Sequence, residues 1–257
     1  MYRILGTGRS GLAALQEKLD LISNNVANSQ TDGYKRLETN FESLLSDSIK
    51  NNGIPLSNIA RQGNPSIGIG SKVSKPSRDT EQGAIVQSEN PYAIAIEGEG
   101  YFGILNKEDN LYLARNGNFR LSEKGHLVDD LGNEVDAKYF YDEISSESIL
   151  EITDSGQINK MDEYGNVSTV GQLKLYSIED YDLLLENGNG YLVADEIESI
   201  DLENSKTILR QGYIEKSNVD IGEELIQMIS TQRAYELNTK SLRAADEMWS
   251  LVNNMRR

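Results

Sequence analysis

Glycines with the spacing of a nucleotide-binding loop are the first feature of this sequence that could support chemistry. Gly98, Gly100 and Gly103 in GEGYFG follow an apolar strand pattern, as in a dinucleotide-binding loop. Such a loop needs a helix directly after it, because the helix N-terminus supplies the donors for the pyrophosphate. The residues that follow, ILNKEDNLYLARNG, indicate a strand and a hairpin turn instead. We therefore interpret these residues as turn and bulge glycines.

The single histidine and the acidic clusters match no catalytic or metal-binding pattern. His126, in EKGHLV, has no cysteine nucleophile and no obvious serine motif beside it, so we interpret it as an exposed strand residue. The acidic stretches 129–136 and 162–166 lack the D-x-[DN]-x-[DN]-G loop, with glutamate at its twelfth position, that binds calcium. We predict no catalytic residue, no cofactor, no metal ligand and no enzyme activity.

Apolar residues recur every seven positions at both ends of the chain and predict a helix at each. The first helix is expected over about residues 10–29, and the second over about 35 residues that open at Ser217 or Asn218. This spacing is typical of the a and d positions of a coiled coil. The residues assigned to these positions are Leu5, Leu12, Leu15, Leu19, Ile22 and Val26 in the first helix and Ile221, Leu225, Met228, Tyr235, Leu242 and Trp249 in the second.

Polar residues interrupt both of these apolar patterns. They are Asn24, Asn25 and Asn28 in the first helix, and Gln232, Thr239 and Asp246 at alternate core positions of the second. Polar groups at such positions lower stability but fix register and partner. A helix hairpin that closes a core within one molecule would show much the same apolar stripe. The polar positions favour self-assembly over that alternative.

The middle of the chain divides into a loop-like part and a strand-rich part. Residues 37–83 are rich in Gly, Pro and Ser with little periodicity, which predicts an extended connecting segment with at most one short strand, at SIGIGSKV. Residues 84–216 alternate with a period of two between turn dipeptides such as Asn116-Gly117 and Gly132-Asn133. That alternation predicts several short antiparallel strands.

These elements together predict an α+β fold, with paired long terminal helices of coiled-coil type and an inserted antiparallel β-rich domain. Residues 1–36 and 217–257 would form a helical polymerisation domain, 37–83 the connecting segment and 84–216 the acidic β-rich domain. Only 38% of the 257 residues are hydrophobic, fewer than is usual for globular domains. This composition favours an elongated or assembling protein over a single compact core.

Charge is distributed unevenly along the chain and limits the possible partners. The net charge is −16, and residues 86–210 alone hold 9 basic and 26 acidic side chains. A strongly acidic chain does not suit nucleic acid, whereas its neutral ends can pack against copies of themselves. No apolar stretch is long enough to cross a membrane. The N-terminus lacks a secretory signal, so we expect a cytoplasmic protein or export without a cleaved signal.

Both ends of the chain resemble one protein family. LDLISNNVANSQTDGYKR, at residues 19–36, resembles the N-terminal signature of bacterial flagellar rod and hook proteins, approximately S-N-N-[LIV]-A-N-x-x-T-x-G-[FY]-K. SNVDIGEELIQMISTQRAYELNTKSLRAADEM resembles the matching C-terminal signature. Residues 65–135 are similar to the distal rod members in particular, whereas 136–210 match poorly. The resemblance is therefore to the flagellar basal-body rod and hook family, most closely to its distal rod protein.

This resemblance implies a structural subunit of the basal-body rod, outside the cytoplasm, that self-assembles into a helical axial tube and transmits torque to the hook. Its implied partners are copies of itself, other rod and hook subunits, and the flagellar export apparatus, which would export it without a cleaved signal peptide. Asn24, Asn25 and Asn28 would bond neighbouring backbones, and the residues around Gly33 and Tyr34 would turn the chain out of the tube. The alternatives are a proximal rod protein and a monomeric acidic calcium- or ligand-binding domain with a helical stalk.

Overall fold

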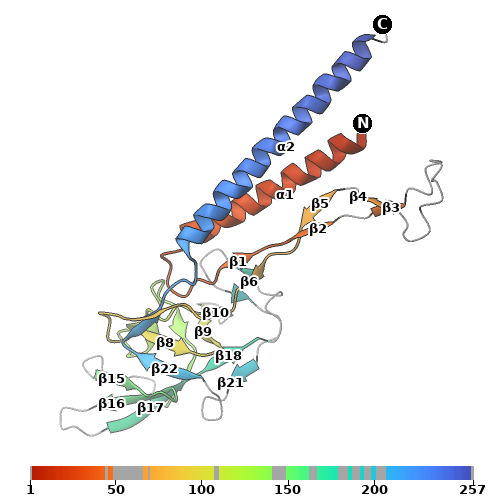
Figure 1. Ribbon diagram of the computed structural model, residues 1–257. Helices are drawn as coiled ribbons and strands as arrows, with labels where there is room; N and C mark the ends of the chain where they lie inside the picture. The colour runs from red at the N-terminus through yellow and green to blue at the C-terminus, as the bar shows by residue number, and fades with distance from the viewer. Residues whose placement is uncertain are drawn as a thin grey trace, which may run out of the picture. The chain divides into compact units, whose positions relative to one another are not determined.

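Two compact units make up the chain in the computed structural model (Figure 1). Unit 1 consists of Met1–Ala27, Leu37–Ser77 and Asp220–Arg257, and unit 2 of Asn28–Arg36 and Arg78–Val219. The chain therefore enters unit 2 twice. The residues that the structure describes are 2–43, 46–48, 66–68, 70–106, 110–140, 149–161, 167–178, 185–186, 192–193, 198–200 and 207–255.

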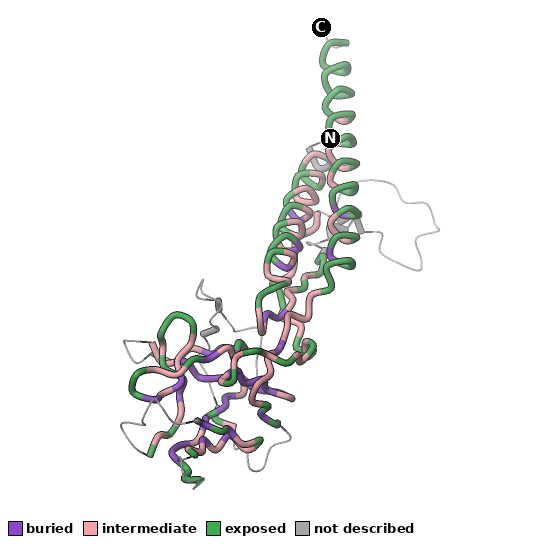
Figure 2. Tube along the Cα trace, turned by 90° about the vertical axis from the view of Figure 1, so that its left-hand side faces the viewer, coloured by how far each residue is buried: buried purple, intermediate pink, exposed green. Residues whose placement is uncertain are grey.

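Unit 1 is built around two long helices, α1 (Tyr2–Ala27) and α2 (Ile221–Met255). They lie side by side with opposite chain directions (Figure 1). The two chain ends therefore lie towards the same end of the pair, and α2, which is the longer helix, extends past the start of α1 (Figure 2). Packing of this kind supplies most of the stability of a long helix in water.

Both helices begin at residues other than those that the sequence pattern indicates. α1 begins at Tyr2 rather than near residue 10. The helix therefore includes Gly6 and Gly8, although glycine is a poor helix former. α2 begins after Asp220, whose carboxylate accepts hydrogen bonds from two backbone N–H groups of the first turn, at 2.7 and 3.2 Å. Asp220 is therefore the N-cap, and the predicted cap at Ser217 or Asn218 is wrong.

Short paired strands account for most of the other residues that the structure describes in unit 1, and the boundary with unit 2 falls within the last of these strands. They are β1 (Leu37–Glu38), β2 (Phe41–Ser43), β3 (Ser46–Ser48), β4 (Ser66–Gly68), β5 (Ser71–Val73) and β6 (Ser77–Arg78). β1 pairs with β6, β2 with β5 and β3 with β4. β5 lies against α1, where the Ser71 N–H donates to Ser10 Oγ at 3.4 Å. Because β4 and β5 both fall in SIGIGSKV, the prediction of at most one strand there is wrong; residues 44–45, 49–65 and 69 of the segment lie outside the described residues.

Unit 2 consists of antiparallel sheets. Its strands are β7 (Ile85–Gln87), β8 (Ile94–Glu97), β9 (Tyr101–Leu105), β10 (Leu111–Ala114), β11 (Arg120–Leu121), β12 (Leu127–Val128), β13 (Glu134–Val135), β14 (Ala137–Tyr139), β15 (Ile149–Ile152), β16 (Gln157–Met161), β17 (Val167–Leu173), β18 (Leu175–Ser177), β19 (Leu185–Glu186), β20 (Leu192–Val193), β21 (Glu198–Ile200), β22 (Ile208–Gln211) and β23 (Tyr213–Glu215). A nine-stranded sheet has the order β11-β12-β13-β9-β10-β20-β19, with β18 on β9 and β21 on β18, and a four-stranded sheet has the order β14-β17-β16-β15. The two ends of the unit pair as β7 with β23 and β8 with β22.

The hydrophobic core of the protein lies in unit 2, where the period-two pattern places one face of each strand inside. Phe102 and Phe119 meet edge to face at 4.9 Å between ring centroids, a favourable aromatic geometry. Both rings are fully buried among aliphatic side chains of the two larger sheets. Figure 2 shows this concentration of buried residues in unit 2, whereas most of α2 is exposed. Together with the two helices, the strand-rich middle confirms an α+β fold.

The two predicted turn dipeptides behave differently in the structure. Gly132 has a φ of +81° between β12 and β13, as expected for a tight hairpin turn. Gly117 does not adopt a positive φ, and its carbonyl accepts the Ile94 N–H at 2.9 Å. A Cβ at Gly117 would lie 1.7 Å from the Ile94 oxygen. Glycine is required there for close approach of the backbones, and the prediction of a positive-φ hairpin turn at that point is wrong.

Candidate functional site

The turn that follows α1 is fixed by hydrogen bonds within it and to β23. Thr31 donates its backbone N–H to the Asn28 carbonyl at 3.0 Å and its hydroxyl to Asn28 Oδ1 at 3.2 Å. Gly33 has a φ of +71°, and its N–H donates to the Glu215 carbonyl at 2.8 Å. A Cβ at Gly33 would lie 2.6 Å from the backbone carbon of Arg115. Both the conformation and the space therefore require glycine.

A buried group of three charged side chains lies beside this turn, and we call Lys35, Arg115 and Glu215 the anchor cluster. Glu215 Oε1 accepts from Lys35 Nζ at 2.7 Å, and Oε2 accepts from Arg115 Nε at 2.6 Å. The side chains of Lys35, Arg115 and Glu215 are 7%, 5% and 1% exposed. The Gly83 N–H also donates to Glu215 Oε1, at 3.0 Å. The buried carboxylate therefore has two cationic donors and one backbone donor, which compensate its loss of solvation.

The remaining donors of Arg115 hold the connection between β8 and β9. Nη2 donates to the carbonyls of Ile96 at 3.2 Å and Gly98 at 2.6 Å, and Nη1 donates to the carbonyl of Gly100. Gly98 and Gly100 have φ values of +116° and +126°, which other residues rarely adopt. The interpretation as turn and bulge glycines is therefore confirmed for Gly98 and Gly100, whereas Gly103 lies within β9 in regular pairing with Leu113.

The residues that directly follow Glu215 also contact the 28–36 segment. Asn218 Oδ1 accepts the Arg36 N–H at 2.7 Å, and Asn218 Nδ2 donates to the Glu81 carbonyl at 3.0 Å. Lys216 and Asp32 form an ion pair at 2.7 Å. The signature turn is therefore held in unit 2 by residues that are distant from it in sequence.

Within unit 1, Asn25 binds the backbone of its own chain. Its Nδ2 donates to the Leu37 carbonyl at 2.9 Å, and its Oδ1 accepts the Leu37 N–H at 3.0 Å. Asn25 is 1% exposed. Its side-chain amide pairs with both the N–H and the carbonyl of Leu37, as the backbone of a neighbouring strand would. The predicted bond to a neighbouring backbone is thus made inside the chain by Asn25, whereas Asn28 bonds to Thr31 and Asn24 is exposed.

Three titratable groups among the described residues of unit 2 have shifted pKa values with structural causes. Burial lowers the pKa of Lys35 below its ordinary value, against the opposing effect of Glu215. Burial raises the pKa of Tyr139 to about 12. Burial and the Asp136 carboxylate raise the pKa of Tyr176, whose hydroxyl donates to Asp136 Oδ2. Lys174 Nζ donates to the same carboxylate at 2.9 Å, so these groups link β18 to the connection between β13 and β14.

His126 is not the exposed strand residue that the sequence indicates. Its side chain is 14% exposed and precedes β12, and its ring stacks on the ring of Tyr139 at 4.2 Å. Nδ1 lies 3.6 Å from a Glu134 oxygen, too far for a normal hydrogen bond. Neither ring nitrogen has a hydrogen-bond partner among the described residues. The ring therefore contributes chiefly by packing on Tyr139.

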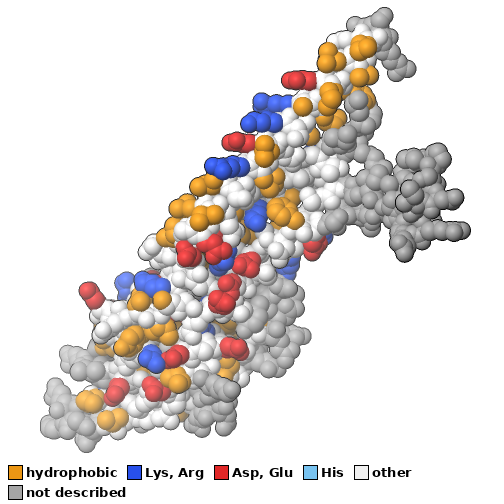
Figure 3. Space-filling view, in the orientation of Figure 1, with side chains coloured by type: hydrophobic (Ala, Val, Ile, Leu, Met, Phe, Trp, Pro, Cys, Tyr) orange, Lys and Arg blue, Asp and Glu red, His pale blue; other side chains and the backbone are white. Residues whose placement is uncertain are grey.

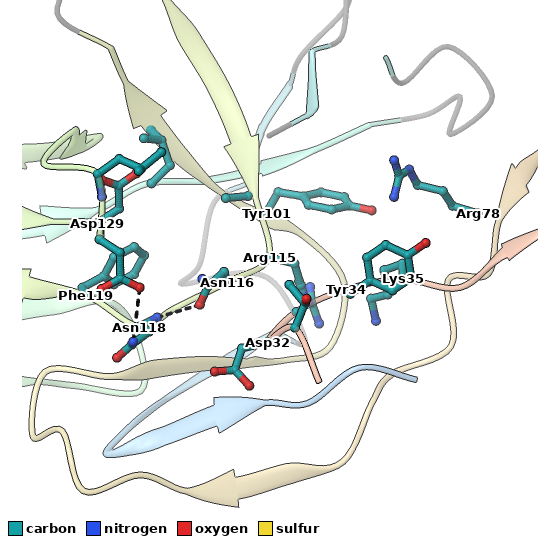
Figure 4. Close-up of a pocket in the computed structure, with 16 residues that line it drawn as sticks. Asp32, Tyr34, Lys35, Arg78, Tyr101, Arg115, Asn116, Asn118, Phe119 and Asp129 are labelled. Atoms are coloured by element: carbon teal, nitrogen blue, oxygen red, sulfur yellow. Dashed lines mark hydrogen bonds between the residues drawn. The ribbon is translucent and has the colours of Figure 1, made fainter. Parts of the chain in front are cut away.

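A cavity of about 280 Å³ lies in unit 2 next to the anchor cluster (Figure 4). Figure 4 shows Tyr101 and Arg78 on one side of it and Phe119 and Asn118 on the other. Asp129, which also lines it, accepts the N–H groups of two residues of its own turn at 2.9 and 2.8 Å. Its described lining residues include acidic and basic side chains but no serine, cysteine or histidine.

The residues that the sequence assigns to self-assembly differ widely in burial. Those of α1 and the turn are mostly covered, whereas α2 leaves several of them in solvent. The buried ones are Ile22, Asn25 and Tyr34; the half-buried ones are Leu5, Leu12, Leu15, Leu19, Val26, Asn28, Gly33, Met228, Tyr235 and Leu242; the exposed ones are Asn24, Ile221, Leu225 and Trp249.

The most buried polar residues of α2 are not the predicted ones, of which Thr239 alone is half-buried. Glu224 and Thr231 are 1% and 6% exposed, and Asn238, seven residues further on, contacts α1. Gln232 and Asp246 are exposed, so their assignment to core positions is wrong for the pair within the chain. In a heptad pattern the next core position lies three or four residues after the previous one. After Ile221 the sequence favours apolar Leu225 as that position, whereas in the structure the buried residue is Glu224.

Exposed apolar side chains, most of them in one group near the start of α2 and one near its end, were largely missed from the sequence. We call them together the outer apolar face (Figure 3). Its side chains are between 45% and 87% exposed, and most lie outside the predicted a positions. The signal was present as further apolar residues three and four positions apart. The members are Leu225, Ile226, Ile229, Leu237, Met248, Leu251, Val252 and Met255.

The described residues contain neither a metal-type cluster nor a membrane-type helix. No three Asp, Glu or His side chains among them are grouped so that they could hold a metal ion. The acidic stretch 162–166 lies outside the described residues. Neither helix combines the length and the hydrophobicity that a bilayer span requires.

Comparison with known proteins links the chain to flagellar components over its whole length. Residues 5–35 match the family model described as flagella basal body rod protein, 95–169 the flagellar hook protein FlgE/F/G D1 domain, and 210–255 the flagellar basal body rod FlgEFG protein C-terminal. Flagellar basal-body rod protein FlgG of Borreliella burgdorferi is 31% identical over 100% of both chains, and FlgG of Caulobacter vibrioides is 33% identical over 98% of both. The flagellar hook-basal body complex protein FlhP of Bacillus subtilis is 27% identical over 100% of both.

Proposed function

The chain belongs to the family of flagellar basal-body rod proteins and is a structural rod subunit, and we propose that it self-assembles into a helical axial tube that transmits torque to the hook. We place it in the distal rod because its FlgG relatives match it from end to end. Copies of itself and other rod and hook subunits are the proposed partners. Export through the flagellar export apparatus remains a prediction of the family resemblance, and no catalytic role is proposed.

The outer apolar face of α2 is the observation that carries this proposal. Exposed apolar side chains grouped on one surface mark interaction sites. Leu251 and Met255, which are 63% and 87% exposed, would each gain about 1.5–3 kcal/mol if a second copy covered them fully. A surface of one copy that contacts a different surface of the next makes an open filament when the rotation does not close. The outer apolar face therefore supports polymer growth by helix packing.

The distribution of charge between the units supports the same proposal. Unit 1 holds 12 basic and 11 acidic side chains, a net charge of +1, whereas unit 2 holds 13 and 30, a net charge of −17. Like charges oppose close association. Copies can therefore pack through unit 1 without electrostatic opposition, and unit 2 does not favour packing against another unit 2.

The test is a pair of neighbouring substitutions in α2 of the full chain. Leu251→Asp puts a carboxylate on the outer apolar face, and Ser250→Asp puts the same charge on an adjacent exposed position. Both variants should stay folded, because neither side chain is buried. We expect Leu251→Asp to abolish filament formation by electron microscopy and motility in cells lacking the native subunit, and Ser250→Asp to retain both. Normal assembly of Leu251→Asp would contradict the proposal.

Deletion of the gene separates the distal from the proximal position. Cells without a distal rod protein should build a proximal rod and stop before the hook, whereas loss of a proximal subunit should stop assembly earlier. Isolated basal bodies viewed by electron microscopy report which of these occurs. A complete hook in the deletion strain would exclude both positions.

A further inference from the structure

The first half of α1 contains three glycines that local structure alone does not explain. Gly6, Gly8 and Gly11 lie inside the helix, in GTGRSG. Glycine is among the least favourable residues in a helix interior. Apart from the adjacent backbone of α1, no described residue lies within 4 Å of a Cβ placed at Gly6. Gly8 and Gly11, unlike Gly6, lie against side chains of α2.

Gly8 and Gly11 form a notch in α1 that two side chains of α2 fill. A Cβ at Gly8 would lie 2.4 Å from Leu242 Cδ1, and a Cβ at Gly11 would lie 2.9 Å from Asn238 Nδ2. Real Cβ atoms essentially never approach other atoms below 3.0 Å. The glycines therefore allow Leu242 and Asn238 closer to the α1 backbone than any other residue type would.

Asn238 adds a directional contact to this fit. Its Nδ2 donates to the Gly8 carbonyl at 3.3 Å, a position open to it because Gly8 and Gly11 carry no side chain. A polar side chain at one core position of a helix pair sets its register, since every other alignment leaves the group without that bond. The bond joins a side chain of α2 to the backbone of α1.

The neighbouring heptads of α2 could not replace the pair in the notch. A shift of seven residues would bring Tyr235 or Trp249 to the position of Leu242, and Thr231 or Ala245 to that of Asn238. Both aromatic side chains are larger than leucine. Alanine has no hydrogen-bonding group, and threonine is too short to reach as asparagine does. The apolar repeat alone permits such shifts, because it looks similar every seven residues.

We propose that the notch of Gly8 and Gly11, with Leu242 and Asn238, locks α1 and α2 in one antiparallel register and assigns this face of α2 to α1. The outer apolar face then stays available to other copies. The inference rests on the proposed function, in which the helix pair is the assembling part. It concerns the pairing within one chain, so it can be tested in the soluble protein without any rod.

Matched substitutions at the three glycines test the notch. Valine is used because the atoms facing Gly8 and Gly11 are the ends of flexible side chains, which could yield to alanine. Gly6→Val, Gly8→Val and Gly11→Val carry a similar intrinsic cost for the helix. We expect Gly8→Val and Gly11→Val to lower amide hydrogen-exchange protection of α1 and α2 in the full chain at least tenfold more than Gly6→Val does. Equal loss in all three variants would overturn the proposal.

Spin labelling tests the register itself, and the chain has no native cysteine to interfere. Ala13→Cys and Arg243→Cys place labels at exposed positions of α1 and α2 and leave the notch intact. We expect the distance between the labels, measured by pulsed electron paramagnetic resonance, to show one narrow peak in the otherwise native chain. With Asn238→Ala added, we expect a second peak, because a shift of one heptad moves one helix by about 10 Å along the other. Two peaks in the otherwise native chain would overturn the register lock. A failure of motility alongside one narrow peak would count against the proposed function and leave the register lock standing.

Discussion

Replacing Glu215 by glutamine should destabilise unit 2 by several kcal/mol. The substitution keeps the shape of the side chain but removes the charge that compensates Lys35 and Arg115. Glu215 is 1% exposed on its side chain, so solvent cannot take over this role. Breaking a buried ion pair from one side costs about 3–5 kcal/mol, and the Gln amide N–H₂ must also face one of the cationic donors. We expect a loss of about 4 kcal/mol, close to the middle of that range.

A surface pair supplies the matched control for this experiment. Glu97 and Arg210 also form a carboxylate–guanidinium pair, but their side chains are 42% and 49% exposed. Glu97→Gln should therefore cost no more than about 1 kcal/mol. The chain has one tryptophan, Trp249 in α2, so fluorescence follows unit 1 while the near-UV circular dichroism of the tyrosines follows mainly unit 2.

The assay is thermal unfolding of the full chain, followed by both signals and by calorimetry. For a unit of this size, about 4 kcal/mol corresponds to a fall of roughly 8–16 °C in the midpoint of unit 2. The midpoint of Glu97→Gln should stay within about 4 °C of the native value. If Glu215→Gln and Glu97→Gln unfolded at the same temperature, the claim that the anchor cluster holds unit 2 together would be refuted.

Two further predictions concern single side chains. Asn25→Leu removes both hydrogen bonds to the Leu37 backbone and should cost about 2–4 kcal/mol, measured as faster hydrogen exchange at Leu37 and in the last turns of α1; unchanged exchange would exclude this role. The pKa of Tyr139 is raised to about 12 from an unfolded value of about 10, so its contribution is complete below pH 10 and is lost as the pH rises through 12. Denaturant unfolding in this range should show stability falling with pH, and falling less steeply in Tyr139→Phe; the same slope in both proteins would contradict the assignment.

Local patterns in the sequence predicted the elements better than their contacts. The heptads found both helices, and the period of two found the strand-rich middle, because each pattern reflects one face of one element. The same patterns could not decide between Glu224 and Leu225 at the α2 core, since three- and four-residue steps alternate along a helix. Apolarity favoured Leu225, whereas the partner helix determines which step faces inward.

The anchor cluster could not be predicted because its members are far apart in sequence. Arg115 and Glu215 are 100 positions apart, and Lys35 and Glu215 are 180 apart. Lys35 belonged to a recognised signature, yet nothing local indicated that it is buried or which carboxylate it meets. The glycines of GEGYFG showed that the chain bends sharply between β8 and β9, and only the fold reveals that the bend turns three carbonyls towards Arg115.

The pairing of β7 with β23 and of β8 with β22 gives unit 2 a closed stem. Lys216 also donates its N–H to the Ala84 carbonyl at 2.9 Å, just outside the first of these pairs. The residues between Glu97 and Ile208 therefore form one segment of the chain, and the strands that precede and follow this segment pair with each other before the chain returns to unit 1. Separation of either end strand would leave the backbone groups of its partner unpaired, and buried unpaired backbone groups are costly. We therefore expect the two ends of unit 2 to open together rather than one at a time.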